Sequence, residues 1–290
     1  MKVSEILREI KVLLRIYASS KSSLFGLTVV IGYIIMAAIG PYFIRLDLIG
    51  LDKPYQLPSL KHPFGTDYLG RDIFAQIVHG ARDVLLLAFI ASLITVAISV
   101  SLGTIAGIKG GKVDSCLMFI TDMMLTIPGF PLLIVVTSLI KGTSNPLILG
   151  LIYAMVSWAS PARAIRSQVL SLKRRDFVEA SRCMGFSTLY IIYFDILPLI
   201  MPYVAVNLLL IMIGAIYSLV GLSLIGAIPW SECNWGIMIN VAVNYAGALS
   251  VPKALPHLIA PLGMIILLQV ALIMLSRSIE MIFNPRLRER

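Results

Sequence analysis

The sequence has 290 residues, of which 58% are apolar and only 13% are charged, with a mean hydropathy of +0.92. Soluble domains have about 45–50% apolar and about 25% charged residues, so this composition excludes an ordinary water-soluble domain and indicates an all-α polytopic membrane protein. The net charge of +9 does not indicate nucleic-acid binding, because cations that flank membrane spans set orientation instead.

Residues 4–18 combine regularly spaced large apolar residues with basic ones, which predicts an amphipathic helix lying in the inner interface of the membrane. Six apolar stretches follow. At about 1.5 Å per residue, each is long enough to cross a hydrocarbon core of about 30 Å. They cover residues 24–44, 84–108, 116–140, 147–165, 199–226 and 257–283.

The distribution of lysine and arginine predicts the orientation of these spans. Most of the 24 basic residues lie in segments that share a side with the N-terminus when the chain crosses the membrane six times. Basic residues near spans favour the cytosolic side. The sequence therefore predicts six transmembrane helices with both termini in the cytosol.

The long outer segment 45–83 contains the run His62-Pro63-Phe64-Gly65-Thr66-Asp67-Tyr68-Leu69-Gly70-Arg71-Asp72. Pro63 and Gly65 predict a turn. Thr66 or Asp67 is expected to cap a following helix at the outer interface, with an apolar stripe that begins at Ile73. His62 and His79 have no acid or cysteine that completes a metal-ligand set, so no metal site is expected.

A second outer segment, residues 227–256, mixes Pro229, Trp230, Trp235 and Tyr245 with apolar residues. Because indole and phenol rings favour the headgroup level, we expect these aromatic residues to anchor the segment at the interface. The run 236–249 has few charges and is expected to form a short interfacial or re-entrant helix.

Four polar residues within the spans are candidates for a translocation path: Asp122, Asn207, Tyr217 and Gln269. Intramembrane acids indicate function by default. Asp122 has two structural alternatives, which are pairing with an arginine or capping a backbone broken at Pro128. The other three residues are equally compatible with hydrogen bonds between packed helices.

The sequence lacks the motifs that catalysis would need. The run from Gly107 to Lys112 looks like a phosphate-binding loop, but Ala106 stands where its first glycine is required and Val113 where serine or threonine is required. No Ser/His/Asp set is present, and the three cysteines follow no metal or disulfide spacing. The chain is expected to have no catalytic residues and no cofactor of its own.

The most informative segment is the basic loop 173–198 between the fourth and fifth spans. Asp176 is expected to start a short helix in which Phe177, Ala180 and Met184 share a face. Gly185 is expected to stop that helix in left-handed geometry. Ser187 is expected to cap a second helix that ends before the span opened by Pro198. The small residues Ala180 and Ser181 are expected to keep the first helix slim enough to enter a groove.

Two motifs carry a resemblance to a known family. Glu179-Ala180-Ser181, Gly185 and Leu197-Pro198 resemble the signature loop of ABC importer permeases, and the run 62–72 is similar to the outer segment of the dipeptide/oligopeptide/nickel type, second or C-type subunit. Further motifs that are similar to those of this family lie between the first span and the C-terminus. Ser181 and Asp195 depart from the signature.

The resemblance implies a type I permease architecture and a heteromeric importer in the cytoplasmic (inner) membrane. Expected partners are a homologous second permease, two ATPase subunits that bind ATP and magnesium, and an extracytoplasmic solute-binding protein. The docking residues for the ATPase would be Phe177, Glu179, Ala180, Ser181, Gly185, Leu197 and Pro198. The outer motif would comprise His62, Pro63, Gly65, Thr66, Asp67, Gly70, Arg71 and Asp72.

The same resemblance divides the chain into three parts. Residues 1–80 would hold the interfacial helix, first span and outer segment, residues 81–283 the permease domain, and residues 284–290 a cytosolic tail. The expected solute is a peptide, with oligosaccharide and nickel as alternatives within the family. A different class, a secondary transporter with Asp122 as its ion site, would need internal pseudo-symmetry and several buried acids, and neither is visible. A membrane scaffold without transport activity is the remaining alternative.

Overall fold

The computed structural model describes residues 21–46, 52–140, 144–228 and 233–283. The predicted interfacial helix 4–18, the tail 284–290, Pro229 and Trp230 lie outside the described residues. Within them the chain is all-helical, and the only strand-like pairing is an isolated bridge between Thr66 and Asp72.

Four uninterrupted helical stretches are long and apolar enough to cross a membrane. They are α2 (Lys21–Phe43), α3 (Ile73–Lys109), the stretch Thr188–Leu224 that ends in α10 (Leu197–Leu224), and α12 (Leu255–Phe283) with the short η2 turn (Pro252–Ala254) before it. α3 is longer than predicted, because the expected outer interfacial helix and the second span form one helix. Its 37 residues extend about 55 Å at about 1.5 Å per residue.

The two remaining predicted spans are broken. α4 (Gly111–Thr126) and α5 (Gly129–Leu139) meet at an angle of 86°, and α6 (Pro146–Ser157) and α7 (Ala159–Leu172) meet at 53°. Pro128 causes the first break, since the residue before a proline is driven to extended geometry, and Ile127 has φ −85° and ψ 125°. Pro161, in the first turn of α7, cannot donate to the carbonyl of Ser157 and clashes with it.

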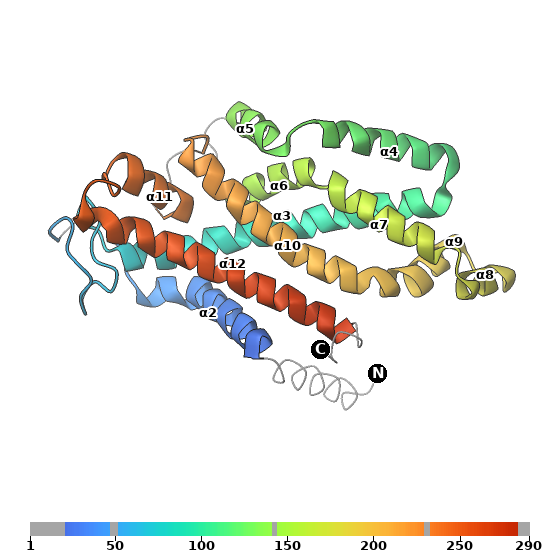
Figure 1. Ribbon diagram of the computed structural model, residues 1–290, viewed down its shortest axis with the longest axis horizontal. Coiled ribbons are helices and arrows are strands. Elements are labelled where there is room, and N and C mark those ends of the chain that lie inside the picture. Colours follow the sequence, from blue (N-terminus) through green and yellow to red (C-terminus); the bar gives the residue numbers. More distant parts are fainter. Residues whose placement is uncertain (1–20, 47–51, 141–143, 229–232, 284–290) are drawn as a thin grey trace.

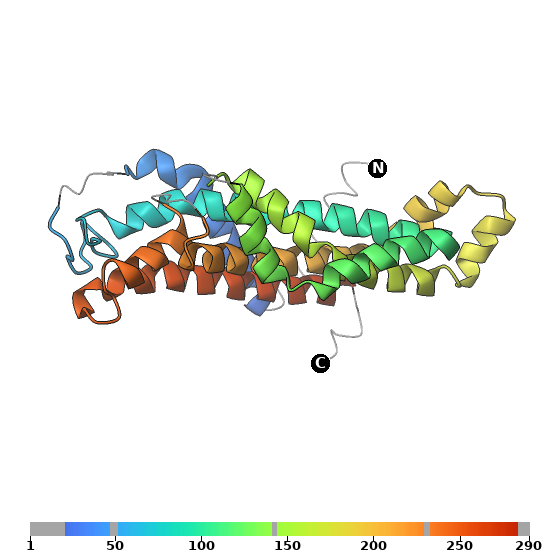
Figure 2. The same cartoon turned by 90° about the horizontal axis from the view of Figure 1, so that it is seen from above.

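The helices lie side by side in an elongated bundle (Figures 1 and 2). One end carries α8 (Asp176–Cys183), while residues 52–72 and α11 (Trp235–Asn244) lie at the opposite end. The start of α2 and the end of α12 both face the end that carries α8 (Figure 1). The predicted basic loop and the predicted outer motif are therefore separated by the full length of the bundle.

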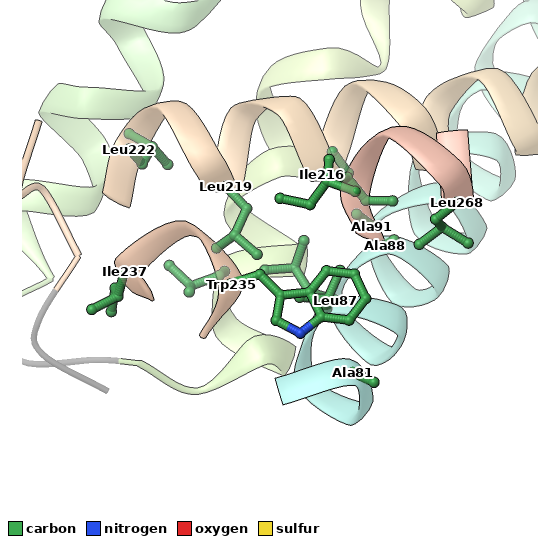
Figure 3. Packing of buried hydrophobic residues seen from close by; sticks show 14 of the residues in the cluster. Ala81, Leu87, Ala88, Ala91, Ile216, Leu219, Leu222, Trp235, Ile237 and Leu268 are labelled. Atoms are coloured by element: carbon green, nitrogen blue, oxygen red, sulfur yellow. The ribbon is translucent and has the colours of Figure 1, made fainter. Parts of the chain in front are cut away.

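Trp235 lies in the main hydrophobic core between α3, α10 and α12, as Figure 3 shows. Its side chain is completely buried, its Nε1 donates to the Ile77 carbonyl at 2.9 Å, and its ring meets Tyr33 edge-on. The expectation that Trp235 anchors the chain at the membrane interface is wrong for this residue. Of the predicted aromatic anchors that the structure describes, Tyr245 has an exposed side chain and retains the geometry of an anchor.

The glycine at position 80 explains how α11 comes so close to α3. A Cβ atom at Gly80 would lie 1.7 Å from the carbonyl oxygen of Cys233 and 2.9 Å from the ring of Trp235. Such distances leave no room for any side chain, so glycine allows the two backbones to meet. α11 is consequently a core helix at the end opposite α8, and most of its residues are buried.

Candidate functional site

A loop built from short helices projects from one end of the bundle (Figures 1 and 2). α7 ends at Leu172, and α8 begins at Asp176 after a turn over residues 173–175. Gly185 has φ +81°, its N–H donates to the Arg182 carbonyl at 2.9 Å, and the Phe186 N–H donates to the Ser181 carbonyl at 3.1 Å. These two bonds form the Schellman motif, so the predicted left-handed helix stop at Gly185 is confirmed.

α8 has two distinct faces. Val178 is completely buried and Ser181 is buried at 7% exposure, and Val178 belongs to a second core cluster with Ile165, Ile196 and other apolar residues. Phe177, Glu179, Ala180 and Met184 are exposed instead. Ser181 therefore faces the chain's own core, contrary to the expectation that its small size fits a groove of another protein. The exposed surface is apolar at Phe177 and Met184 and carries the carboxylates of Asp176 and Glu179.

The second helix of the loop does not stop before the fifth span. Ser187 caps α9 (Thr188–Tyr190), as predicted, by accepting from the Tyr190 N–H at 3.2 Å. The chain then runs through a π-helical turn, Ile191–Ile196, directly into α10. The expected boundary at Pro198 is thus absent. Pro198 cannot donate a backbone N–H to the preceding turn, and that turn is a wider π turn, a form found mostly as a single-turn bulge inside α-helices. Leu197 is half-buried and Pro198 is exposed.

Three aromatic residues that the sequence reasoning missed form a ladder along this second helix. Phe186 stacks on Tyr190 with ring centroids 4.3 Å apart, and Tyr190 stacks on Phe194 at 4.7 Å. All three rings are exposed, between 37% and 66%. Their spacing of four residues places them on one face of the second helix, which was predicted to run to Asp195, and this spacing could have revealed the ladder. The loop thus presents a second exposed apolar surface beside that of α8.

The four polar candidates for the translocation path are not brought together. Asp122 pairs with Arg163, Asn207 donates to the Tyr203 carbonyl of its own helix at 2.9 Å, and the Tyr217 side chain is exposed. Gln269 is buried, with no hydrogen-bond partner for its Nε2 among the described residues. No hydrogen bond or ion pair joins any two of the four within the described part of the chain. The ion pair of Asp122 matches one of its two structural alternatives.

The outer motif is held together by the carboxylate of Asp67, which is completely buried at the end opposite α8. Its Oδ1 accepts from the N–H groups of Leu69 and Arg71 at 2.9 and 2.8 Å. Its Oδ2 accepts from Arg71 Nε at 2.7 Å and from Gln76 Nε2 at 3.1 Å. A buried charge needs such partners, so Asp67 and Arg71 stabilise the loop from inside.

The remaining motif residues shape the same loop. Pro63 lies in a turn closed by a bond from the Gly65 N–H to the His62 carbonyl at 2.9 Å, which confirms the predicted turn. Thr66 donates to the Lys53 carbonyl at 2.8 Å and accepts from the Gln56 N–H. Gly65 and Gly70 have φ +78° and +79°. The motif therefore folds residues 52–72 into a fixed hydrogen-bonded unit.

Asp72 caps α3, and not Thr66 or Asp67 as predicted. It accepts from the Phe74 N–H at 3.1 Å, and partial burial raises its pKa. His62 lies between two carboxylates, with Nε2 3.2 Å from Asp52 and Nδ1 3.7 Å from Asp72. A hydrogen bond from Lys61 holds the pKa of Asp52 below its ordinary value. Thr66 and Asp67, the two predicted cap residues, form hydrogen bonds within the loop instead.

Two large apolar hollows lie outside these sites. One of about 650 Å³ is lined by residues of α2, α3, α10 and α12, and Arg82 is the one charged residue in its lining. Another of about 490 Å³ lies between Phe64 of the outer loop and the start of α12. Neither hollow is lined by Asp122, Asn207, Tyr217 or Gln269. The geometry thus favours the projecting loop as the functional site.

Comparison with known proteins agrees with this geometry. The chain is 32% identical over 230 residues to the oligopeptide transport system permease protein OppC of Bacillus subtilis, covering 77% of this chain and 74% of that protein. It is 34% identical over 227 residues to the dipeptide transport system permease protein DppC of the same organism, covering 76% and 69%.

The fold is similar to a chain of the MetNI methionine ABC transporter solved in inward-facing conformations. The TM-score is 0.55 at 20% identity, covering 70% of this chain and 96% of that chain. Residues 99–289 match the family described as binding-protein-dependent transport system inner membrane component. Together with its apolar helices, this match makes the chain a multi-pass protein of the cell membrane. The chain belongs to the family of binding-protein-dependent transport system inner membrane components.

Proposed function

We propose that this chain is one of two permease subunits in an ATP-driven importer that receives peptides from an extracytoplasmic binding protein. The observation that carries the proposal is the two-faced helix α8 at one end of the bundle. Val178 and Ser181 fix its inner face to the core, while Phe177, Ala180 and Met184 remain exposed on the outer face. A rigidly mounted apolar face on a polar loop is suited to docking a protein partner.

The partner for this face is an ATPase subunit. When ATP closes a pair of ATPase subunits, each would pull on the loop docked in it, and α8 would carry that movement to the spans. The aromatic ladder Phe186–Tyr190–Phe194 provides a second contact surface, because its rings are exposed and continuous with α10. ATP and magnesium would bind on the partner, so this chain would contribute no catalytic residues.

The proposed membrane topology has six spans, counting each bent helix pair as one, with both termini and the loop 173–198 in the cytosol. Residues 81–283 would form the type I permease domain, preceded by residues 1–80 and followed by the tail 284–290. The outer motif around Asp67 would then face the binding protein. The shared direction of the start of α2 and the end of α12 supports this arrangement (Figure 1).

The proposed solute is a peptide because the two relatives described above are named for oligopeptide and dipeptide transport. Oligosaccharide and nickel are the alternatives that a transport assay must separate. A secondary transporter with Asp122 as its ion site is less compatible with the structure, since that carboxylate already pairs with Arg163. The two permeases would enclose the solute between them.

The test is to express the chain with the second permease, ATPases and binding protein from its own gene neighbourhood. Peptide, oligosaccharide and nickel uptake are measured in proteoliposomes. Phe177→Asp should weaken ATPase retention during purification by roughly thirtyfold, the equivalent of about 2 kcal/mol for a central interface anchor. Leu60→Asp, which adds the same charge to an exposed leucine at the opposite end of the bundle, is the matched control and should retain the ATPase.

Normal ATPase retention by Phe177→Asp at normal expression would refute docking through α8. ATP hydrolysis by the purified chain without any partner would refute the assignment of ATP hydrolysis to another subunit. Uptake of oligosaccharide or nickel, but not of peptides, would leave the architecture in place and replace the proposed solute.

A further inference from the structure

Helix α4 is held to the rest of the chain mainly by charge. Of its 16 residues only Thr121 is buried, so apolar packing within the chain contributes little to its position. Two ion pairs link it to α7 instead. Asp114 accepts from both Nε and Nη2 of Arg166, and Asp122 accepts from Arg163. The side chains of the first pair are 17% and 28% exposed, and those of the second are 62% and 49% exposed.

These pairs form a ladder between two helices. Arg163 and Arg166 are one turn apart on α7, and Asp114 and Asp122 lie on one side of α4, so both contacts run between the same two helix faces. A third cation of this segment, Lys173, donates to the Ile108 carbonyl at the end of α3, beside the turn at Gly110 that leads into α4. The two ion pairs therefore connect α7 with α4, and Lys173 ties the segment before α8 to the end of α3.

α7 is itself fixed firmly to α3. A Cβ atom at Gly103 of α3 would lie 2.6 Å from the Ala162 carbonyl of α7, and Ala162 is completely buried. Small residues permit this close backbone approach between membrane helices. α3 and α7 thus form a packed pair, and α8 follows α7 after residues 173–175. α4 differs, because its polar contacts to this pair are ion pairs whose side chains are only partly buried within the chain.

α4 leads directly into the sharpest bend of the chain. Its last turn meets Ile127 and Pro128, after which α5 departs at 86°. Within α4 itself so few residues are buried that this helix can change its angle relative to α7 at little cost in apolar packing, while α5 stays attached to the main core through Leu133. The ion pairs lie on the only helix of this broken span that faces α7. They are consequently placed where movement of α7 and α8 would reach α4 and α5.

We propose that Asp114, Asp122, Arg163 and Arg166 are coupling residues that transmit the movement of α8 to the broken span α4–α5. This inference rests on the proposed function. They act as positioning residues, since none would touch the solute or ATP. The ion pairs make α4 move together with α7 when the ATPases close. Without them ATP hydrolysis continues, but the broken span moves less for each ATP hydrolysed.

The test compares neutralised and exchanged pairs in the complete reconstituted complex. Asp114→Asn and Arg166→Gln remove one pair, and the double exchange Asp114→Arg with Arg166→Asp restores it in the opposite sense. Asp122 and Arg163 are treated in the same way. Arg174→Gln is the control, because it removes the same charge from an exposed arginine that has no ion pair in the described residues. Each complex is assayed for assembly, ATPase rate and solute uptake.

We expect the neutral variants to assemble and hydrolyse ATP, with uptake per ATP reduced about fivefold, a size typical of changes in a coupling network. The exchanged pairs should recover at least half of the loss, and Arg174→Gln should behave as the unmodified complex. Unchanged uptake per ATP in the neutral variants would overturn the proposal, as would failure of those variants to assemble, which would make the pairs purely structural. Failure of the unmodified complex to transport would instead refute the proposed function.

Discussion

Gly185 offers a way to perturb the docking loop through its backbone alone. Its φ of +81° lies in the left-handed region, and no heavy atom lies within 4 Å of a Cβ placed there, so a side chain would meet no obstacle inside the chain. Alanine in this conformation costs about 1–2 kcal/mol, or roughly five- to thirtyfold in the population of the intact turn. Valine, which is β-branched, costs about 3 kcal/mol and roughly 150-fold. Asparagine tolerates left-handed geometry and serves as the control.

The spans keep their apolar sequence in all three variants, so each should reach the membrane at normal levels. Uptake and ATPase retention should fall in the order asparagine, alanine, valine, because strain at residue 185 opens the two Schellman hydrogen bonds and misdirects α8. Proteoliposome uptake and co-purification measure this order. Equal and near-normal uptake for Gly185→Val and Gly185→Asn would refute the reasoning. Equal loss in all three would show that a partner fills the space beside residue 185, and strain would then not be the cause.

Three further predictions concern the end opposite α8. Trp235→Ala should destabilise the purified chain by about 3–5 kcal/mol, the usual cost of removing a large buried aromatic side chain, and thermal unfolding in detergent measures it. Asp67→Asn should cost about 3 kcal/mol, since it leaves the buried Arg71 without its carboxylate, and unchanged thermal unfolding would contradict this. Asp72→Asn keeps the cap of α3 and removes a carboxylate whose raised pKa makes its ionised form unfavourable in the folded chain. The Asp72→Asn variant should therefore be the more stable one at neutral pH, and its advantage should shrink as the pH falls through the pKa of the folded Asp72. Asp72→Ala also lacks the cap, so it should be about 1 kcal/mol less stable than Asp72→Asn at every pH.

The sequence predicted the positions of the membrane helices well because apolar length is a direct property of composition. All six predicted stretches overlap helical segments of the structure, and the turn at Pro63 and the helix stop at Gly185 follow from local backbone preferences. Helix ends were predicted less well. Thr66 and Asp67 are good caps by residue type, but their side chains are engaged by the loop around them, and Asp72 takes the role. Residue type alone cannot decide which of Thr66, Asp67 and Asp72 caps the helix, because each has different hydrogen-bond partners in the folded loop.

Long-range packing accounts for the larger errors. An indole in an outer segment favours the interface by its chemistry, and only the absence of a side chain at Gly80, far away in sequence, allows Trp235 into the core. The motif around Ser181 was expected to be exposed, but Ser181 faces the core of the chain together with Val178. The ion pair between Asp122 and Arg163 was one of two structural alternatives, which spacing along the chain could not separate. In each case the deciding contact joins residues from different helices.

The docking loop is connected to the bundle in two ways that differ in stiffness. At its C-terminal end, the helix that carries the aromatic ladder continues through the π turn into α10 without a break. A movement of Phe186 or Tyr190 would therefore be passed on to α10. At the N-terminal end of the loop, α8 follows α7, which is packed tightly on α3 but linked to α4 through partly exposed ion pairs. In the proposed transport cycle, a pull on the loop would move α7 and α10, and α4 would follow through its ion pairs. Since α4 leads into the 86° bend, this difference would concentrate the change of shape at Pro128. The hinge of the proposed transport cycle is accordingly expected at the α4–α5 break, where α4 would turn relative to α5, which is attached to the core around Trp235 through Leu133.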